Sequence, residues 1–334
     1  MIEKKSQDSS EYKYAVEKIN QWYKKGAKVL TIASLPYNSI TIFKPIINEI
    51  LKKNGKILYV WGEKREIKDL INDTLITTLK LKYSTVENED SKIVFLNFEE
   101  AMYVKNIYDL IIIDDLGYLG INNKFHIKFV VDNLYNHSKK IINYDIDKCI
   151  NYGDYIEICD INNYSPVLEP RIITTKINIL EDIPYVLYEY LKWFKERNRR
   201  VLIIVPDSLS YEKIIEKYIK VFKLKGIQLI TISENNKPIT KISLSKEKAF
   251  FIITSDISNY IKDIKNLDVV MLGADDNKYS YKAMVYLSSI VSRNSNGGGE
   301  MLLVANSISY SMETSKNILR DYNKLLWEKG LLKV

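Results

Sequence analysis

Two adjacent carboxylates end an apolar run in the first half of the chain. Residues 111–115 (IIIDD) indicate a buried strand that ends in Asp114 and Asp115, and Gly117 favours a turn directly after them. In sheets of parallel strands, ligands gather at the carboxyl ends of the strands. In a nucleotide-binding domain the first acid holds Mg²⁺ and the second orients the attacking water. The pair therefore predicts an acidic nucleotide-site motif; the plainer alternative is a polar strand end beside a turn.

A second candidate for phosphate chemistry lies nearer the N-terminus. Residues 31–43, TIASLPYNSITIF, lead from an apolar strand through a short turn into an amphipathic stretch, 42–51, that ends at Gly55. The order strand, loop, helix is the frame of a phosphate-binding loop. This turn has neither the glycines nor the lysine that such a loop uses. The segment is either a phosphate-binding loop that lost its chemistry or a loop that never had it.

Short β-branched runs alternate with helical patterns, and these elements must position the candidate residues. We expect strands at 28–32, 56–61, 92–97, 110–114, 140–144, 171–176, 201–205, 228–232, 249–254, 269–272 and 301–304. We expect helices at 14–25, 184–196, 211–222 and 312–329. Because the strand runs are continuous rather than alternating, both faces of each sheet should be covered. Helices between strands then predict an α/β fold with parallel, doubly wound sheets.

Length and composition limit the possible functions. A chain of 334 residues favours two domains, and the aperiodic stretch DINNYSPVL, 160–168, places the boundary between 1–163 and 164–334. Two cysteines and two histidines exclude a four-ligand zinc cluster of the usual spacing. The polar start has no apolar signal region and the apolar runs are too short to span a bilayer, so we expect a cytoplasmic protein with no membrane span. The net charge of +7 permits a polyanionic partner.

The C-terminal part of the chain resembles a known family. Residues 267–305, with a VVMLGA strand, a helix ending in Arg293 and the segment GGGEMLLVA, resemble the last motif region of superfamily 2 helicases. The likeness is closest to the competence-type DNA-uptake ATPase (ComF operon protein A), and replication-restart helicases are more distant. Residues 199–214 resemble the motif that opens the second lobe in that family. The resemblance implies two tandem RecA-like domains with parallel sheets, of the P-loop NTPase type.

Laid on that family's pattern, the phosphate-binding loop departs from G-x-x-x-x-G-K-T. It falls on residues 34–41, where Ser39 replaces the second glycine, Ile40 replaces the lysine and Thr41 alone matches. Glycine reaches the backbone conformations that turn successive N–H groups toward a phosphate, and the lysine supplies positive charge. Pro36 removes one N–H group. Pro45 would lie inside a helix that began at Ser39, so we expect the helix to begin later.

The family's last motif is altered too. The pattern Q-x-x-G-R-x-G-R falls on residues 286–293, where Ile290 replaces the arginine that contacts the γ-phosphate in active members, and Arg293 alone matches. Loss of such an arginine costs a factor of roughly 10³–10⁵ in rate. Asp115 stands where glutamate is usual. We therefore interpret Asp114, Asp115 and Arg293 as vestigial catalytic residues and residues 39–41 as a vestigial cofactor-binding loop.

These departures favour a helicase-like pseudoenzyme that does not hydrolyse ATP and needs no cofactor, a DNA-binding or scaffolding relative of the DNA-uptake helicases. No metal is expected; Asp114 would hold Mg²⁺ only if Mg-nucleotide binds. One alternative is a divergent but active DNA-dependent ATPase or translocase that uses Mg-ATP. Another is an unrelated two-domain α/β transferase, which the absence of a GxGxxG fingerprint and of a plausible catalytic histidine or cysteine weakens.

The expected partner is single-stranded DNA or a DNA-processing protein. In active relatives, single-stranded DNA crosses both lobes and is held largely through its backbone, and such contacts need no ATP chemistry. Lys64, Arg65 and Arg171 are the candidate nucleic-acid contacts, although each could be an ordinary solvated charge. The basic cluster 197–200 precedes a core strand on the side opposite its ligand-bearing end and is not a candidate.

Overall fold

The structure, a computed structural model, divides the chain into two compact units, and the division falls between Tyr164 and Ser165. Each unit is described by itself below. The residues that the structure describes are 9–36, 38, 40–61, 83–87, 90–116, 124–161, 163–179, 181–206, 214, 227–232, 249–255, 266–294 and 299–332.

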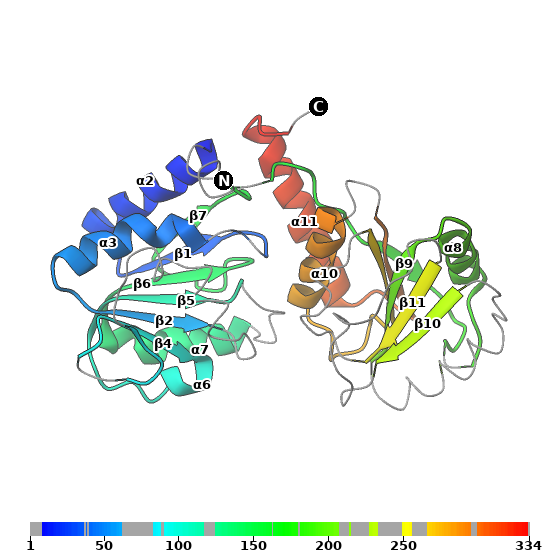
Figure 1. Cartoon of the computed structure of the whole chain (residues 1–334), viewed down its shortest axis with the longest axis horizontal. Helices are drawn as coiled ribbons and strands as arrows, with labels where there is room; N and C mark the ends of the chain where they lie inside the picture. The colour runs from blue at the N-terminus through cyan, green and yellow to red at the C-terminus, as the bar shows by residue number, and fades with distance from the viewer. Residues whose placement is uncertain are drawn as a thin grey trace. The chain divides into compact units, whose positions relative to one another are not determined.

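The first unit is one parallel sheet with helices on both faces (Figure 1). Its strands are β1 (Val29–Ala33), β2 (Ile57–Trp61), β3 (Tyr83–Ser84), β4 (Ile93–Asn97), β5 (Tyr108–Asp114), β6 (Ser138–Asp145) and β7 (Asp154–Glu157). Its helices are α2 (Ser10–Lys25), η1 (Ile40–Phe43), α3 (Lys44–Lys52), α6 (Phe98–Ala101), α7 (Lys124–Leu134) and η2 (Tyr135–His137). The strands lie in the order β3-β4-β2-β5-β6-β1-β7, and the described pairs are all parallel.

Apolar side chains on the two faces of this sheet pack against different helices. Ile111, Ile113 and Ile141 share a core with buried residues of α6 and α7. The opposite face carries Tyr144, whose ring contacts the Phe43 ring of η1 edge-on with 5.2 Å between centroids. Figure 1 shows α2 and α3 on this second face. Because strand side chains alternate between faces, Asp114 at the end of β5 lies on the opposite face from Ile113.

The second unit repeats this architecture with other elements. Its strands are β8 (Arg171–Thr174), β9 (Arg200–Ile204), β10 (Ile227–Ile232), β11 (Ala249–Thr254), β12 (Leu267–Leu272) and β13 (Met301–Ala305). Its described helices are α8 (Tyr185–Glu196), α10 (Tyr281–Asn294) and α11 (Tyr310–Glu328). The strand order is β10-β11-β9-β12-β13-β8, again parallel throughout the described pairs. Helix α8 lies on one face, and α10 and α11 lie on the other (Figure 1).

The expected fold class is confirmed, and all eleven expected strands are present within a few residues of their expected bounds. Two strands were missed. β3 has only two residues, and β7, with the sequence DYIE, is a half-exposed edge strand rather than an apolar run. The expected helix 211–222 lies outside the described residues except for Ile214. Among the described helices, none combines the length and apolarity that crossing a bilayer requires.

Candidate functional site

The loop that follows β1 is closed by the side chain of Asn38. The Asn38 Nδ2 group donates to Ser34 Oγ at 2.7 Å and to the Cys159 carbonyl oxygen at 2.9 Å, and Asn38 Oδ1 accepts from the Ile161 amide at 3.2 Å. Ser34, Leu35 and Asn38 are all buried. The carboxamide therefore fastens this loop to the segment at 159–161, at the carboxyl edge of the sheet, where the resemblance places a phosphate.

The regular helix after this loop begins late, as predicted. A 3₁₀ turn, η1, comes first, and α3 then starts at Lys44 with Pro45 in its first turn. Proline is tolerated there because the first amides of a helix have no intrahelical acceptor. Thr41 is buried within η1 and Ile40 is half-buried, whereas Ser39 lies outside the described residues. The first free amides of the α-helix are thus displaced along the chain from the loop.

Asp114 is buried and accepts a hydrogen bond at each of its carboxylate oxygens. Its exposed fraction is 2%. Tyr59 of the neighbouring strand donates its hydroxyl to Asp114 Oδ2 at 2.7 Å, and the Leu116 amide donates to Asp114 Oδ1 at 3.0 Å. Asp115 is buried as well, and its amide donates to the Tyr144 carbonyl oxygen at 3.0 Å. A metal ion at Asp114 would compete with two hydrogen bonds that the fold already makes.

One other group of potential metal ligands lies near this edge. Within the described part of the chain, ligand atoms of Asp145, Asp147 and Cys149 lie within 4.8 Å of one another. The Cys149 sulfur lies 2.8 Å from Asp145 Oδ2 and 3.1 Å from Asp147 Oδ1, and its single S–H group donates between these two oxygens. These hydrogen bonds account for the closeness of the three side chains. The cluster lies at the end of β6 and the loop that follows it.

The second unit holds the altered last motif on α10. Ile290 is buried in the core, so its position cannot present a side chain to a nucleotide without a change of packing. Ser289 and Ser292 donate their hydroxyls to the carbonyl oxygens one turn earlier, those of Val285 and Ser288, at 2.8 Å each. Arg293 is half-buried in the last turn of the helix. Asp114 and Arg293 belong to different units.

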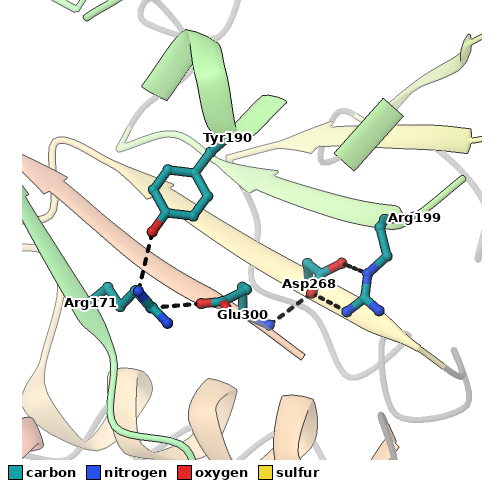
Figure 2. Close-up of polar contacts among 5 residues, drawn as sticks. All are labelled: Arg171, Tyr190, Arg199, Asp268 and Glu300. Atoms are coloured by element: carbon teal, nitrogen blue, oxygen red, sulfur yellow. Dashed lines mark hydrogen bonds and ion pairs between the residues drawn. The ribbon is translucent and has the colours of Figure 1, made fainter. Parts of the chain in front are cut away.

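The candidate nucleic-acid residues are only partly described. Lys64 and Arg65 lie outside the described residues. Arg171 lies at the amino end of β8, where its Nε contacts Glu300 Oε2 at 2.9 Å and its Nη1 donates to the Tyr190 hydroxyl at 3.4 Å (Figure 2). Its side chain is 61% exposed, but its guanidinium already has a carboxylate partner. A DNA contact by Arg171 stays a prediction.

A bidentate ion pair lies beside Arg171 in the same sheet. Arg199 Nε and Nη2 contact the two carboxylate oxygens of Asp268 at 2.7 Å each, and the Glu300 amide donates to Asp268 Oδ1 at 2.8 Å (Figure 2). The Asp268 side chain is fully buried. Burial raises the pKa of Asp268, and the hydrogen bonds from Arg199 oppose that rise. The same bonds raise the pKa of Arg199.

Comparison with solved structures assigns the fold. The DUF1998 helicase MrfA, solved bound to DNA, matches 96% of this chain with a TM-score of 0.50 and 14% identity. The DExH-box NTPase HrpB of E. coli matches 92% with a TM-score of 0.53 and 11% identity. The fold of this chain is therefore similar to that of these two solved proteins. This chain spans 51% of the MrfA chain and 42% of the HrpB chain. No protein-family model and no curated protein matches the sequence.

The fold brings together residues that no sequence pattern pairs. The sequence marks Asn38 only as part of the loop, and Tyr59 only as part of a strand. The strand order supplies what was missing, because β2 lies beside β5 and pairs Tyr59 with Ile112, on the same face as Asp114. The sequence presents Arg199 as a charge that flanks a strand, whereas its partner Asp268 is the second residue of β12, 69 residues later. An aspartate within an otherwise apolar strand was the available signal.

Proposed function

We propose that this protein is a non-hydrolysing, helicase-like pseudoenzyme that binds single-stranded DNA or a DNA-processing protein and is related to the DNA-uptake helicases. The observation that carries the proposal is the Asn38 carboxamide, which bonds Ser34, Cys159 and Ile161 where a phosphate-binding loop would leave its amides facing a ligand. A side chain with three buried hydrogen bonds resists displacement, since each lost bond leaves a buried polar group unpaired.

The acidic pair supports the same proposal. Mg²⁺ prefers near-octahedral oxygen coordination and keeps several waters, which requires room around the first aspartate. Asp114 is enclosed, and both its oxygens accept hydrogen bonds from Tyr59 and Leu116. Its role in this proposal is to fix the end of β5 against β2. No cofactor and no metal are then needed, and Thr41 and Asp115 are structural.

In the second unit, the replacement of an arginine by Ile290 also supports the proposed loss of ATP hydrolysis. Ile290 stands where the resemblance expects an arginine at the γ-phosphate, and it is buried on α10. A transferring phosphoryl group carries charge that is stabilised by such an arginine and by the loop lysine. Ile40 replaces that lysine. Arg293, the matched residue, then serves the fold of the second unit rather than catalysis.

Separate observations support the proposal that DNA is the partner. The similar helicase MrfA was solved bound to DNA, and the charge of this chain is +7. Helicase lobes hold single strands largely through phosphate contacts, which persist without ATP turnover. We place this protein with DNA handling in the cytoplasm, as the resemblance to the DNA-uptake ATPase suggests.

The first test is ATP turnover. With Mg-ATP and single-stranded DNA we expect no phosphate release above that of an Asp114→Ala control, and no rise in melting temperature, because a nucleotide that binds the native state must raise it. The Asp114→Ala variant separates the protein's own activity from a contaminant. Phosphate release that disappears in Asp114→Ala would refute the proposal and identify a divergent, active DNA-dependent ATPase with Mg-ATP as its cofactor.

The second test is DNA binding as a function of salt. If Lys64 and Arg65 contact phosphates, a Lys64→Ala, Arg65→Ala double variant should reduce the slope of log affinity against log salt by about 1.4, at about 0.7 for each phosphate of a single strand. Arg171→Ala is measured separately: a fall in slope of about 0.7 would support the predicted phosphate contact of Arg171, and an unchanged slope would fit its pairing with Glu300 alone. If the protein does not bind DNA even at low salt, DNA is not its partner, and a scaffolding role with a DNA-processing protein remains.

A further inference from the structure

A pocket on the second unit has both aromatic walls and acidic groups. Its volume is about 430 Å³, and it is lined by Tyr185, Val186, Glu189, Tyr190, Trp193 and Glu300. Ligand pockets in proteins range over about 300–1,000 Å³. Five of the six lining residues come from α8, and Glu300 directly precedes β13. The pocket thus lies at the amino ends of the strands, away from the carboxyl edge that carries nucleotide chemistry in such sheets.

Ion pairs hold the walls of this pocket in place. Arg171 donates to the Tyr190 hydroxyl and pairs with Glu300, as Figure 2 shows. Arg199, held by the buried Asp268, lies over the Trp193 ring with its Cζ 5.8 Å from the ring centroid. Each of these two aromatic side chains therefore contacts an arginine that is itself fixed by a carboxylate. A pocket whose walls are already positioned binds with less loss of conformational freedom.

The open side of the pocket is apolar and acidic. Tyr185 is 73% exposed, Val186 is 51% exposed and Trp193 is 36% exposed, which is unusual for large apolar side chains. The two charged lining residues are both glutamates. Glu300 is paired with Arg171, whereas Glu189 is exposed and has no ion-pair partner in the described part of the chain. Aromatic faces attract cations, and a carboxylate beside them adds to that attraction.

We propose that this pocket is a docking site for a segment of a partner protein that presents a lysine or arginine side chain next to an apolar one. The cation would lie against the exposed rings of Tyr185 and Trp193 and pair with Glu189, and the apolar neighbour would cover Val186. The unpaired carboxylate would repel a phosphate backbone, so the charge favours a basic peptide over nucleic acid. This docking site can be tested apart from ATP turnover and from the Lys64 and Arg65 contacts, because Asp114, Lys64 and Arg65 do not line the pocket.

A displayed library of random peptides, selected on the full chain, tests the proposal. Peptides that bind should be enriched in lysine and arginine beside apolar residues. A synthetic peptide of the enriched sequence should bind Glu189→Gln about 2–5-fold more weakly and Trp193→Ala at least about fivefold more weakly than the unchanged chain, since cation–π and charged contacts of this kind are worth such factors. The control is Glu196→Gln, a second exposed glutamate of α8 outside the pocket, which should change nothing.

Several outcomes would overturn the docking site. Enriched peptides with no excess of basic residues would do so, as would peptides that bind Glu189→Gln and Trp193→Ala as well as the unchanged chain. An oligothymidylate whose binding is lost in Trp193→Ala but not in Lys64→Ala would make the pocket a base-stacking site instead. Because Trp193→Ala could lower stability, Trp193→Phe is measured beside it; this variant keeps an aromatic wall and should retain most of the binding.

Discussion

Replacing Arg199 by alanine should lower the free energy of unfolding of the second unit by about 3–5 kcal/mol, the cost of removing one partner of a buried ion pair. The cost is large because Asp268 is fully buried and would lose two charge-assisted hydrogen bonds of 2.7 Å. Urea denaturation followed by hydrogen exchange of β9 and β12 would measure it. The control is Arg171→Ala, which removes a pair whose arginine is 61% exposed and should cost about 0–1 kcal/mol.

The loss from Arg199→Ala should also depend on pH. Burial raises the pKa of Asp268, and Arg199 opposes this, so its removal should raise the folded-state pKa of Asp268 further. A group with a raised folded-state pKa favours folding below its unfolded pKa, about 3.9 for aspartate, and that contribution is lost as pH rises through the folded-state value. The deficit of the variant should therefore be smallest in acid and grow toward neutral pH. Equal deficits for Arg199→Ala and Arg171→Ala at neutral pH would contradict this account of the pair.

Replacing Asn38 by alanine should lower the free energy of unfolding of the first unit by about 2–4 kcal/mol, because the change leaves buried groups of the loop and of segment 159–161 unpaired. Asn38 makes three hydrogen bonds through its carboxamide. Denaturant unfolding monitored by exchange of the β1 amides would measure the loss.

The matched control for Asn38→Ala is Asn136→Ala, an exposed asparagine of η2 in the same unit, which should cost less than about 0.5 kcal/mol, as surface changes usually do. An Asn38→Asp variant separates the two halves of the carboxamide: it keeps an acceptor for the Ile161 amide but loses both donated hydrogen bonds. If Asn38→Ala and Asn136→Ala unfold at the same denaturant concentration, Asn38 does not hold this loop, and the main support for the proposed function is lost.

The local elements follow from the amino-acid sequence. Continuous β-branched runs such as 110–114 indicate strands that are buried on both faces. A strand covered on both faces has no solvent-exposed side, so polar residues do not alternate with apolar ones. Pro45 determined the late start of α3, because proline fits the first turn of a helix and clashes in its interior. The polar edge strand β7 was not predicted, since a strand with exposed faces has no apolar run in its sequence.

Which side chains meet depends on the three-dimensional packing of these elements. Asn38 reaches Cys159 across 121 residues, Tyr59 reaches Asp114 across 55, and Arg199 reaches Asp268 across 69. A sequence pattern indicates whether a position is buried. The partner of a buried polar group depends on the strand order, which is set by contacts between distant parts of the chain. That order brings segment 159–161 to the Asn38 carboxamide and Tyr59 to Asp114. It also brings Arg171 and Arg199 to the aromatic residues of the pocket.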